Sequence, residues 1–112
     1  MTEAEGTALL LARFTAAGYV IARDFPFQEG DIHVDLDGWD AKARVGYEYI
    51  TVEAGDDLQF DEATLARFEA RMEKGELAVL LVDEHEAVTA EALEMAAQGF
   101  LEMVAHERGG AR

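Results

Sequence analysis

Three stretches with the pattern of β-strands follow one another without a helical stretch between them, and this order constrains the fold of the chain most strongly. Residues 31–37, DIHVDLD, alternate strictly between apolar side chains on one face and Asp or His on the other. The flanking stretches 18–25, GYVIARDF, and 44–53, RVGYEYITVE, are rich in β-branched and aromatic residues. Strands joined by short connections predict an antiparallel meander, in which Pro26 either ends the first strand or marks an edge of the sheet.

Helical patterns surround this meander. The spacing of apolar residues predicts helices over residues 3–17 and 62–74, and a last helix that begins after Thr89 as its N-cap. Between the second and the third helix, residues 76–84, ELAVLLVDE, form a continuous apolar run, which is typical of a strand buried on both faces. Because a strand reached through a helix pairs in parallel with an earlier one, this run predicts a central, parallel strand.

The segments between these elements are short. Residues 38–43, GWDAKA, predict a turn, and residues 54–57, AGDD, predict a loop. The sequence therefore predicts one α/β (α+β) domain over residues 1–112, with the element order α-β-β-β-α-β-α and a mixed sheet flanked by helices.

The chain is strongly acidic. Nine Lys and Arg face 24 Asp and Glu, which gives a formal net charge of −15. Because nucleic-acid binding draws on neutralised phosphates, this charge argues against a nucleic-acid partner. A basic protein partner, metal cations or solubility alone fit the charge better. The chain has no cysteine, a start without a basic signal region and no apolar run long enough to span a bilayer, so we expect a cytoplasmic protein without a membrane partner.

Glu48 lies in the middle of the third predicted strand, among tyrosines and Ile50. It is either a metal ligand or a carboxylate that faces water from one side of a sheet. A hard cation such as Mg²⁺ binds carboxylate oxygens, and Asp35, Asp37 and Asp40 precede Glu48 on or beside the neighbouring strand. The sequence alone leaves both interpretations open.

The stretch LLARFTAAGYVIARDFPFQEGDIHVDL, residues 10–36, and the order of the elements resemble the core of the restriction-endonuclease-like, PD-(D/E)XK, superfamily and its small resolvase-like members. In that family, an Asp near the second strand and a (D/E)-x-K sequence on the third strand assemble a Mg²⁺ site. The resemblance implies that Glu48 stands at the acidic position, while Ile50 stands at the lysine position. The metal-binding Asp falls on His33 or, if the register slips by two residues, on Asp35.

The missing lysine has a chemical consequence. A lysine beside the metal orients the attacking water and stabilises developing negative charge, so its loss predicts a domain that kept the fold and lost the cleavage. Lys42 in the preceding turn, and Arg67, Arg71 and Lys74 on the following helix, are the cations that could take its place.

Aromatic residues gather around the same strands. Trp39 lies in the predicted turn and Tyr47 and Tyr49 on the third strand, and exposed Trp and Tyr are favoured anchors of protein interfaces. The leading hypothesis is therefore a non-enzymatic, acidic protein-binding domain, such as an adaptor or an immunity-like protein. It has no cofactor, and its partner is either a basic protein or a second copy of the chain.

Two alternatives remain open. The first is a Mg²⁺-dependent nuclease-like enzyme with Asp35 and Glu48 as first ligands, assisted by Asp37 or His33. The second is a metal-binding regulatory domain without cleavage. A full acidic site with a convergent lysine favours the enzyme, whereas a flat, acidic and aromatic surface favours the protein-binding domain.

Overall fold

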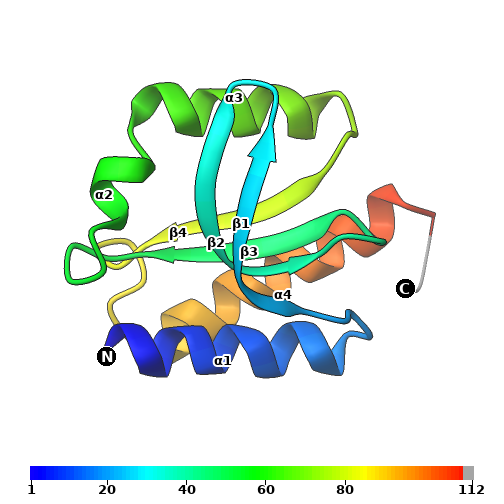
Figure 1. The fold of residues 1–112 in the computed structure, drawn as a ribbon. Coiled ribbons are helices and arrows are strands. Elements are labelled where there is room, and N and C mark those ends of the chain that lie inside the picture. Colours follow the sequence, from blue (N-terminus) through cyan, green and yellow to red (C-terminus); the bar gives the residue numbers. More distant parts are fainter. Residues whose placement is uncertain (110–112) are drawn as a thin grey trace.

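The computed structural model describes residues 1–109 without the side chain of Asp57, and the last three residues of the predicted domain 1–112 lie outside this part (Figure 1). The elements follow the predicted order α-β-β-β-α-β-α, with one additional single-turn helix. They are α1 (Glu3–Ala16), β1 (Ala22–Glu29), β2 (Ile32–Asp40), β3 (Val45–Ile50), α2 (Asp56–Gln59), α3 (Glu62–Glu73), β4 (Ala78–Asp83) and α4 (Ala90–Glu107). Within the described residues, no helix has both the length and the apolar character needed to cross a membrane.

The four strands form one sheet in the order β1-β2-β3-β4. β1 pairs with β2 and β2 with β3 in antiparallel orientation, and β3 pairs with β4 in parallel. The predicted meander, the mixed sheet and the parallel strand are therefore confirmed. The predicted central position of β4 is wrong, because β4 pairs with β3 alone and lies at an edge of the sheet.

Several predicted strand boundaries change: β1 begins at Ala22 rather than at residue 18, and β3 ends at Ile50 rather than at residue 53. Pro26 does not end the first strand, since β1 continues to Glu29 and Pro26 pairs with Asp35 inside it. Pro is tolerated there because β1 is the other edge strand and is paired on one side only. β2 likewise continues through the first half of the predicted turn to Asp40, so the connection to β3 is confined to residues 41–44.

The segment predicted as a loop, residues 54–57, leads into α2 instead. Gly55 has a left-handed backbone conformation with φ 76°, which glycine adopts without strain, and the helical turn Asp56–Gln59 follows directly. The predicted N-cap of the last helix is confirmed, because the Thr89 hydroxyl accepts a hydrogen bond from the Ala92 N–H at 3.1 Å.

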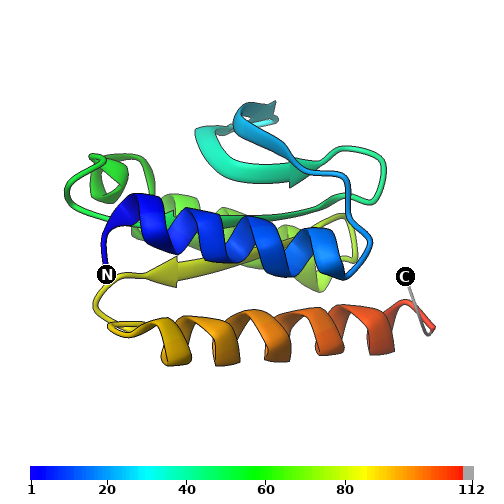
Figure 2. The same ribbon diagram turned by 90° about the horizontal axis from the view of Figure 1, so that it is seen from below.

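Helices cover both faces of the sheet. α1 and α4 run alongside each other against β3 and β4, while α3 lies on the opposite side (Figures 1 and 2). The β1–β2 hairpin extends from β3 toward α3. The molecule is thus a layered α+β domain in which β3 and β4 lie between the two groups of helices.

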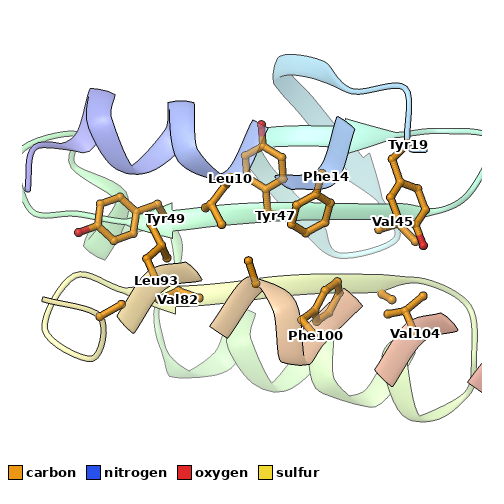
Figure 3. Packing of buried hydrophobic residues seen from close by; sticks show 13 residues of the cluster. Leu10, Phe14, Tyr19, Val45, Tyr47, Tyr49, Val82, Leu93, Phe100 and Val104 are labelled. Atoms are coloured by element: carbon orange, nitrogen blue, oxygen red, sulfur yellow. The ribbon is translucent and has the colours of Figure 1, made fainter. Parts of the chain in front are cut away.

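Each side of the sheet has its own hydrophobic cluster. On the α1 and α4 side, Phe14 packs on Tyr47 and on Phe100, with ring centroids 4.8 Å and 5.9 Å away (Figure 3). On the α3 side, Phe27 contacts Phe68 and the edge of Trp39, with ring centroids 5.7 Å and 5.0 Å away. These aromatic contacts fix both helical layers on the sheet and involve most of the buried aromatic side chains.

Candidate functional site: carboxylates between β2 and β3

The pairing of β2 with β3 is short, and the candidate site lies where it stops. The two strands pair from Asp40 with Val45 to Gly38 with Tyr47, and they separate beyond this point. β2 continues beside β1, whereas β3 continues beside β4. The next residues on the two strands are Asp37 and Glu48. Backbone groups that face such a split lose their ladder partners and need others.

Two carboxylates supply these partners across the split. The Asp37 N–H donates a hydrogen bond to Oε1 of Glu48 at 2.7 Å, and the Tyr49 N–H donates one to Oδ2 of Asp37 at 2.8 Å. Farther along the split, the Asp35 N–H donates to Oε1 of Gln59 in α2 at 3.0 Å. Each strand therefore holds a carboxylate of the other in place by a backbone N–H.

Glu48 is fully buried, with 0% of its surface exposed. Its Oε1 accepts the bond from Asp37, but its buried Oε2 has no hydrogen-bond partner among the described residues. The interpretation of Glu48 as a carboxylate that faces water is therefore wrong. An ionised carboxylate without a partner is costly in such a position, so Glu48 either holds a proton or requires a cation.

The neighbouring carboxylates intensify this cost. Burial raises the pKa of Glu48 far above its ordinary value, and the charges of Asp37 and Asp56 raise it further. Burial also raises the pKa of Asp37 to about 7, against the lowering effect of the Tyr49 N–H, and the charges of Asp56 and Glu3 add to it. The site is thus a group of carboxylates that disfavour one another's ionisation.

Asp56 and Glu3 were not predicted as site residues. Asp56 begins α2, where its Oδ2 accepts a bond from the Thr51 N–H at the end of β3. Glu3 begins α1, and burial together with the charges of Asp56 and Asp24 raises its pKa as well. Glu3 is distant in the sequence from the third strand, whereas Asp56 follows the end of β3 by six residues. No spacing in the sequence signals that the two converge.

The described part of the chain places no positive charge in an ion pair with the site carboxylates. Within residues 1–109, no Lys, Arg or His forms an ion pair with Asp37, Glu48 or Asp56. Ile50, at the position of the family's lysine, is 6% exposed and belongs to the cluster on the α3 side.

The four cations named as replacements for the lysine lie elsewhere. Lys42 is exposed in the turn between β2 and β3, and Lys74 is exposed at the end of α3. The remaining two face other carboxylates: Arg67 pairs with Asp31, and Arg71 with Glu29 and Glu76.

The other predicted site residues divide into surface and core. Asp35 and His33 are exposed, and Asp35 is hydrogen-bonded to Gln59, so the structure brings Asp37 rather than Asp35 together with Glu48.

The predicted anchors of a protein interface are core residues: Trp39 is 2% exposed, and Tyr47 and Tyr49 are 1% exposed. Trp39 is buried because β2 runs through the predicted turn and carries it under Phe27. These three side chains present no surface to a partner.

The carboxylate oxygens of Asp37 and Glu48 are the atoms of the site that could bind a metal ion. Among the described residues, no group of three or more His, Cys, Asp or Glu side chains is arranged to hold a metal ion. Mg²⁺ keeps several waters and takes one or two carboxylates from a protein. Asp37 and Glu48, with the unpartnered Oε2, fit that requirement.

Comparison with known proteins adds no family to this description. No family model, no curated protein and no solved structure matches the chain at a significant level.

Proposed function

We propose that this chain is a non-catalytic binding domain that takes up a divalent cation of the Mg²⁺ class between β2 and β3. The observation that carries the proposal is the buried Oε2 of Glu48, which lacks a partner within a group of carboxylates that no described cation neutralises. Asp37 and Glu48 would hold the ion. A bound cation would stabilise the ionised forms of both and would join the two strands where their backbone pairing has ended.

Cleavage of nucleic acid is not part of the proposal. Ile50 is a core residue, and none of the described cations pairs with the site carboxylates. A nuclease-like mechanism would lack the positive charge that orients water and stabilises the developing anion. The net charge of −15 further opposes the approach of a polyphosphate.

The test is a thermal-unfolding titration with MgCl₂ and with MnCl₂ at pH 8. A ligand that binds only the folded state stabilises it by about 2.7 kcal/mol at a hundred times its dissociation constant. We expect wild type to gain stability at micromolar Mn²⁺ and the Glu48→Gln variant to lose this gain. Gln retains an oxygen that can accept from the Asp37 N–H, so it removes the charge with little change in shape.

Asp35→Asn is the matched control. It removes one carboxylate from the same strand, two residues from Asp37, at an exposed position. It should keep the gain with Mn²⁺. If all three proteins respond alike and only at millimolar salt, the cation is bound diffusely by an acidic surface and the proposal is wrong. Cleavage of plasmid DNA or RNA with Mn²⁺, abolished in Glu48→Gln, would instead favour the nuclease-like enzyme.

The protein-binding role expected from the charge stays a prediction. Because Trp39, Tyr47 and Tyr49 are in the core, that role requires a different surface from the one expected.

A further inference from the structure

An open groove of about 530 Å³ lies between α4 and the C-terminal half of α1. Its apolar lining comes from Ala16 at the end of α1, from the following residue Ala17, and from Met95, Leu101 and Ala105 on α4. Figure 2 shows the two helices running alongside each other over this length. Met95 is 74% exposed and is the most exposed large apolar side chain of α4, where Leu93, Phe100 and Val104 are buried.

The charged residues that line the groove are mostly acidic. Glu91, Glu94 and Glu102 face a single cation, Arg13, among the lining residues of the described chain. Arg13 is already paired with Glu94, with 3.2 Å between Nη2 and Oε1. The groove therefore combines an apolar surface with an excess of negative charge, and it belongs to a chain whose net charge is −15.

We propose that this groove binds a basic amphipathic helix of a partner protein. Such a helix lays apolar side chains spaced i, i+3, i+4 and i+7 into a groove between two helices. A flexible, polarisable Met side chain adapts to the contour of an incoming apolar face. Lys or Arg residues that flank the stripe would meet the glutamates of the groove, which favours and orients the encounter.

A second copy of the chain is the poorer occupant. Two molecules with a net charge of −15 repel each other, and each would bring its own glutamates to the groove. The proposal is also independent of the cation site, because the groove is lined by α1 and α4 residues whereas Asp37 and Glu48 lie on β2 and β3. Failure of one proposal leaves the other intact.

The experiment uses a short fluorescent peptide of Leu and Lys, with Leu at i, i+3, i+4 and i+7, and measures its anisotropy against the whole chain. The decisive variant is Met95→Asp. The matched control is Met103→Asp, on the same helix, because Met103 is 46% exposed and lies outside the lining of the groove. Both variants add the same negative charge, so a non-specific attraction of the peptide changes equally in both.

We expect Met95→Asp to weaken binding by about tenfold, as for the loss of a central apolar anchor, and Met103→Asp to change it by less than about twofold. Circular dichroism verifies that both variants are folded. Equal affinity of the two variants for the peptide would overturn the proposal, because it would show charge attraction alone. A wild-type dimer in light scattering that Met95→Asp dissociates would also overturn it, since the occupant would then be a second copy.

Discussion

Two buried or half-buried carboxylates of this molecule, Glu29 and Glu48, have opposite surroundings. Glu29, at the end of β1, accepts hydrogen bonds from both terminal nitrogens of Arg44 at 2.7 and 2.8 Å and from Arg71 at 2.8 Å. These guanidinium groups lower the pKa of Glu29 to about 2, the hydrogen bonds of Arg44 contributing most. Glu48 is more deeply buried, has no such partner within the described residues, and has its pKa raised.

The different surroundings of the two carboxylates indicate different roles. Glu29 has a structural role, whereas the packing of the fold does not explain the charge of Glu48. Glu29 connects the β1–β2 hairpin to Arg44 at the start of β3 and to Arg71 on α3, so its charge is accounted for by the fold. Arg44 has φ 62°, and its bidentate pair helps to hold that unfavourable backbone conformation. Glu48 accepts one backbone hydrogen bond, which a neutral side chain could also accept, and its other neighbours include the carboxyl groups of Asp37 and Asp56 rather than a cation.

The largest expected effect is that of Glu48→Gln on the pH dependence of stability. A carboxyl with a raised folded-state pKa contributes most stability below its unfolded-state pKa and loses it as the pH rises toward the folded-state value. The pH range over which this stability is lost ends at about pH 7 for Asp37 and extends above neutrality for Glu48. Each group lowers the free energy of unfolding by up to about 1.4 kcal/mol per pH unit.

In Glu48→Gln the contribution of Glu48 disappears, so the variant should exceed wild type in free energy of unfolding at pH 8 by roughly 2–4 kcal/mol without added metal. Urea unfolding at several values between pH 5 and pH 8, in the presence of a chelator, measures this. Asp35→Asn, which also removes one charge, should follow the wild-type curve. Parallel curves for wild type and Glu48→Gln would contradict the assignment of a strongly perturbed carboxyl.

Glu29→Gln should have the opposite sign and a smaller size. The loss of the charge leaves Arg44 and Arg71 without their shared carboxylate, and about a third of the Glu29 side chain is exposed, which screens the effect. We expect a loss of about 1–2 kcal/mol in the free energy of unfolding at pH 7. The contribution of wild-type Glu29 is present above its unfolded-state pKa and is lost as the pH falls toward 2.

Glu94→Gln is the control for that variant. Glu94 pairs with Arg13, but both side chains are about half exposed, so its loss should stay within about 0.5 kcal/mol. Urea midpoints of the two variants at pH 7 give the comparison. A larger loss of stability in Glu94→Gln than in Glu29→Gln would show that the ion pairs of Glu29 do not hold the β1–β2 hairpin in place.

Asp56→Asn should produce a smaller change than Glu48→Gln and Glu29→Gln. The variant keeps an oxygen that can accept from the Thr51 N–H and removes one of the charges that raise the pKa values of Asp37 and Glu48. We expect a gain of less than about 1 kcal/mol at pH 8, because Asp56 is partly exposed. NMR titration of the Asp37 carboxyl should show its pKa moving down. A loss of stability would mean that the hydrogen bond to Thr51 matters more than the charge.

The sequence predicts the elements of this fold better than their lateral positions. The alternation in residues 31–37 and the apolar run in residues 76–84 identify β2 and β4 because each follows from local periodicity. The run does not reveal whether a further strand pairs beyond it, since α3 and α4 bury both faces of β4 even at an edge. Local periodicity also fails to predict the burial of Trp39, because that burial depends on how far β2 continues.

For the candidate site, the sequence singles out Glu48 because a carboxylate is unusual in an aromatic and β-branched strand. The choice of Asp37 over Asp35 depends on where β2 and β3 separate, and this point is set by the tertiary packing of the hairpin. Asp56 and Glu3 approach through α2 and α1, whose positions no local pattern encodes. What the sequence misses is therefore convergence between distant segments.

The parallel pairing of β4 has a further consequence, for the assembly of the sheet. The pairs of β1 with β2 and of β2 with β3 close short loops, such as the one between Glu29 and Ile32. The first pair of β3 with β4 joins Val45 to Ala78 and must enclose α2 and α3 between them. Within the sheet, the largest loop-closure entropy thus falls on the docking of β4, so we expect β4 to pair after the meander, which forms from neighbouring residues.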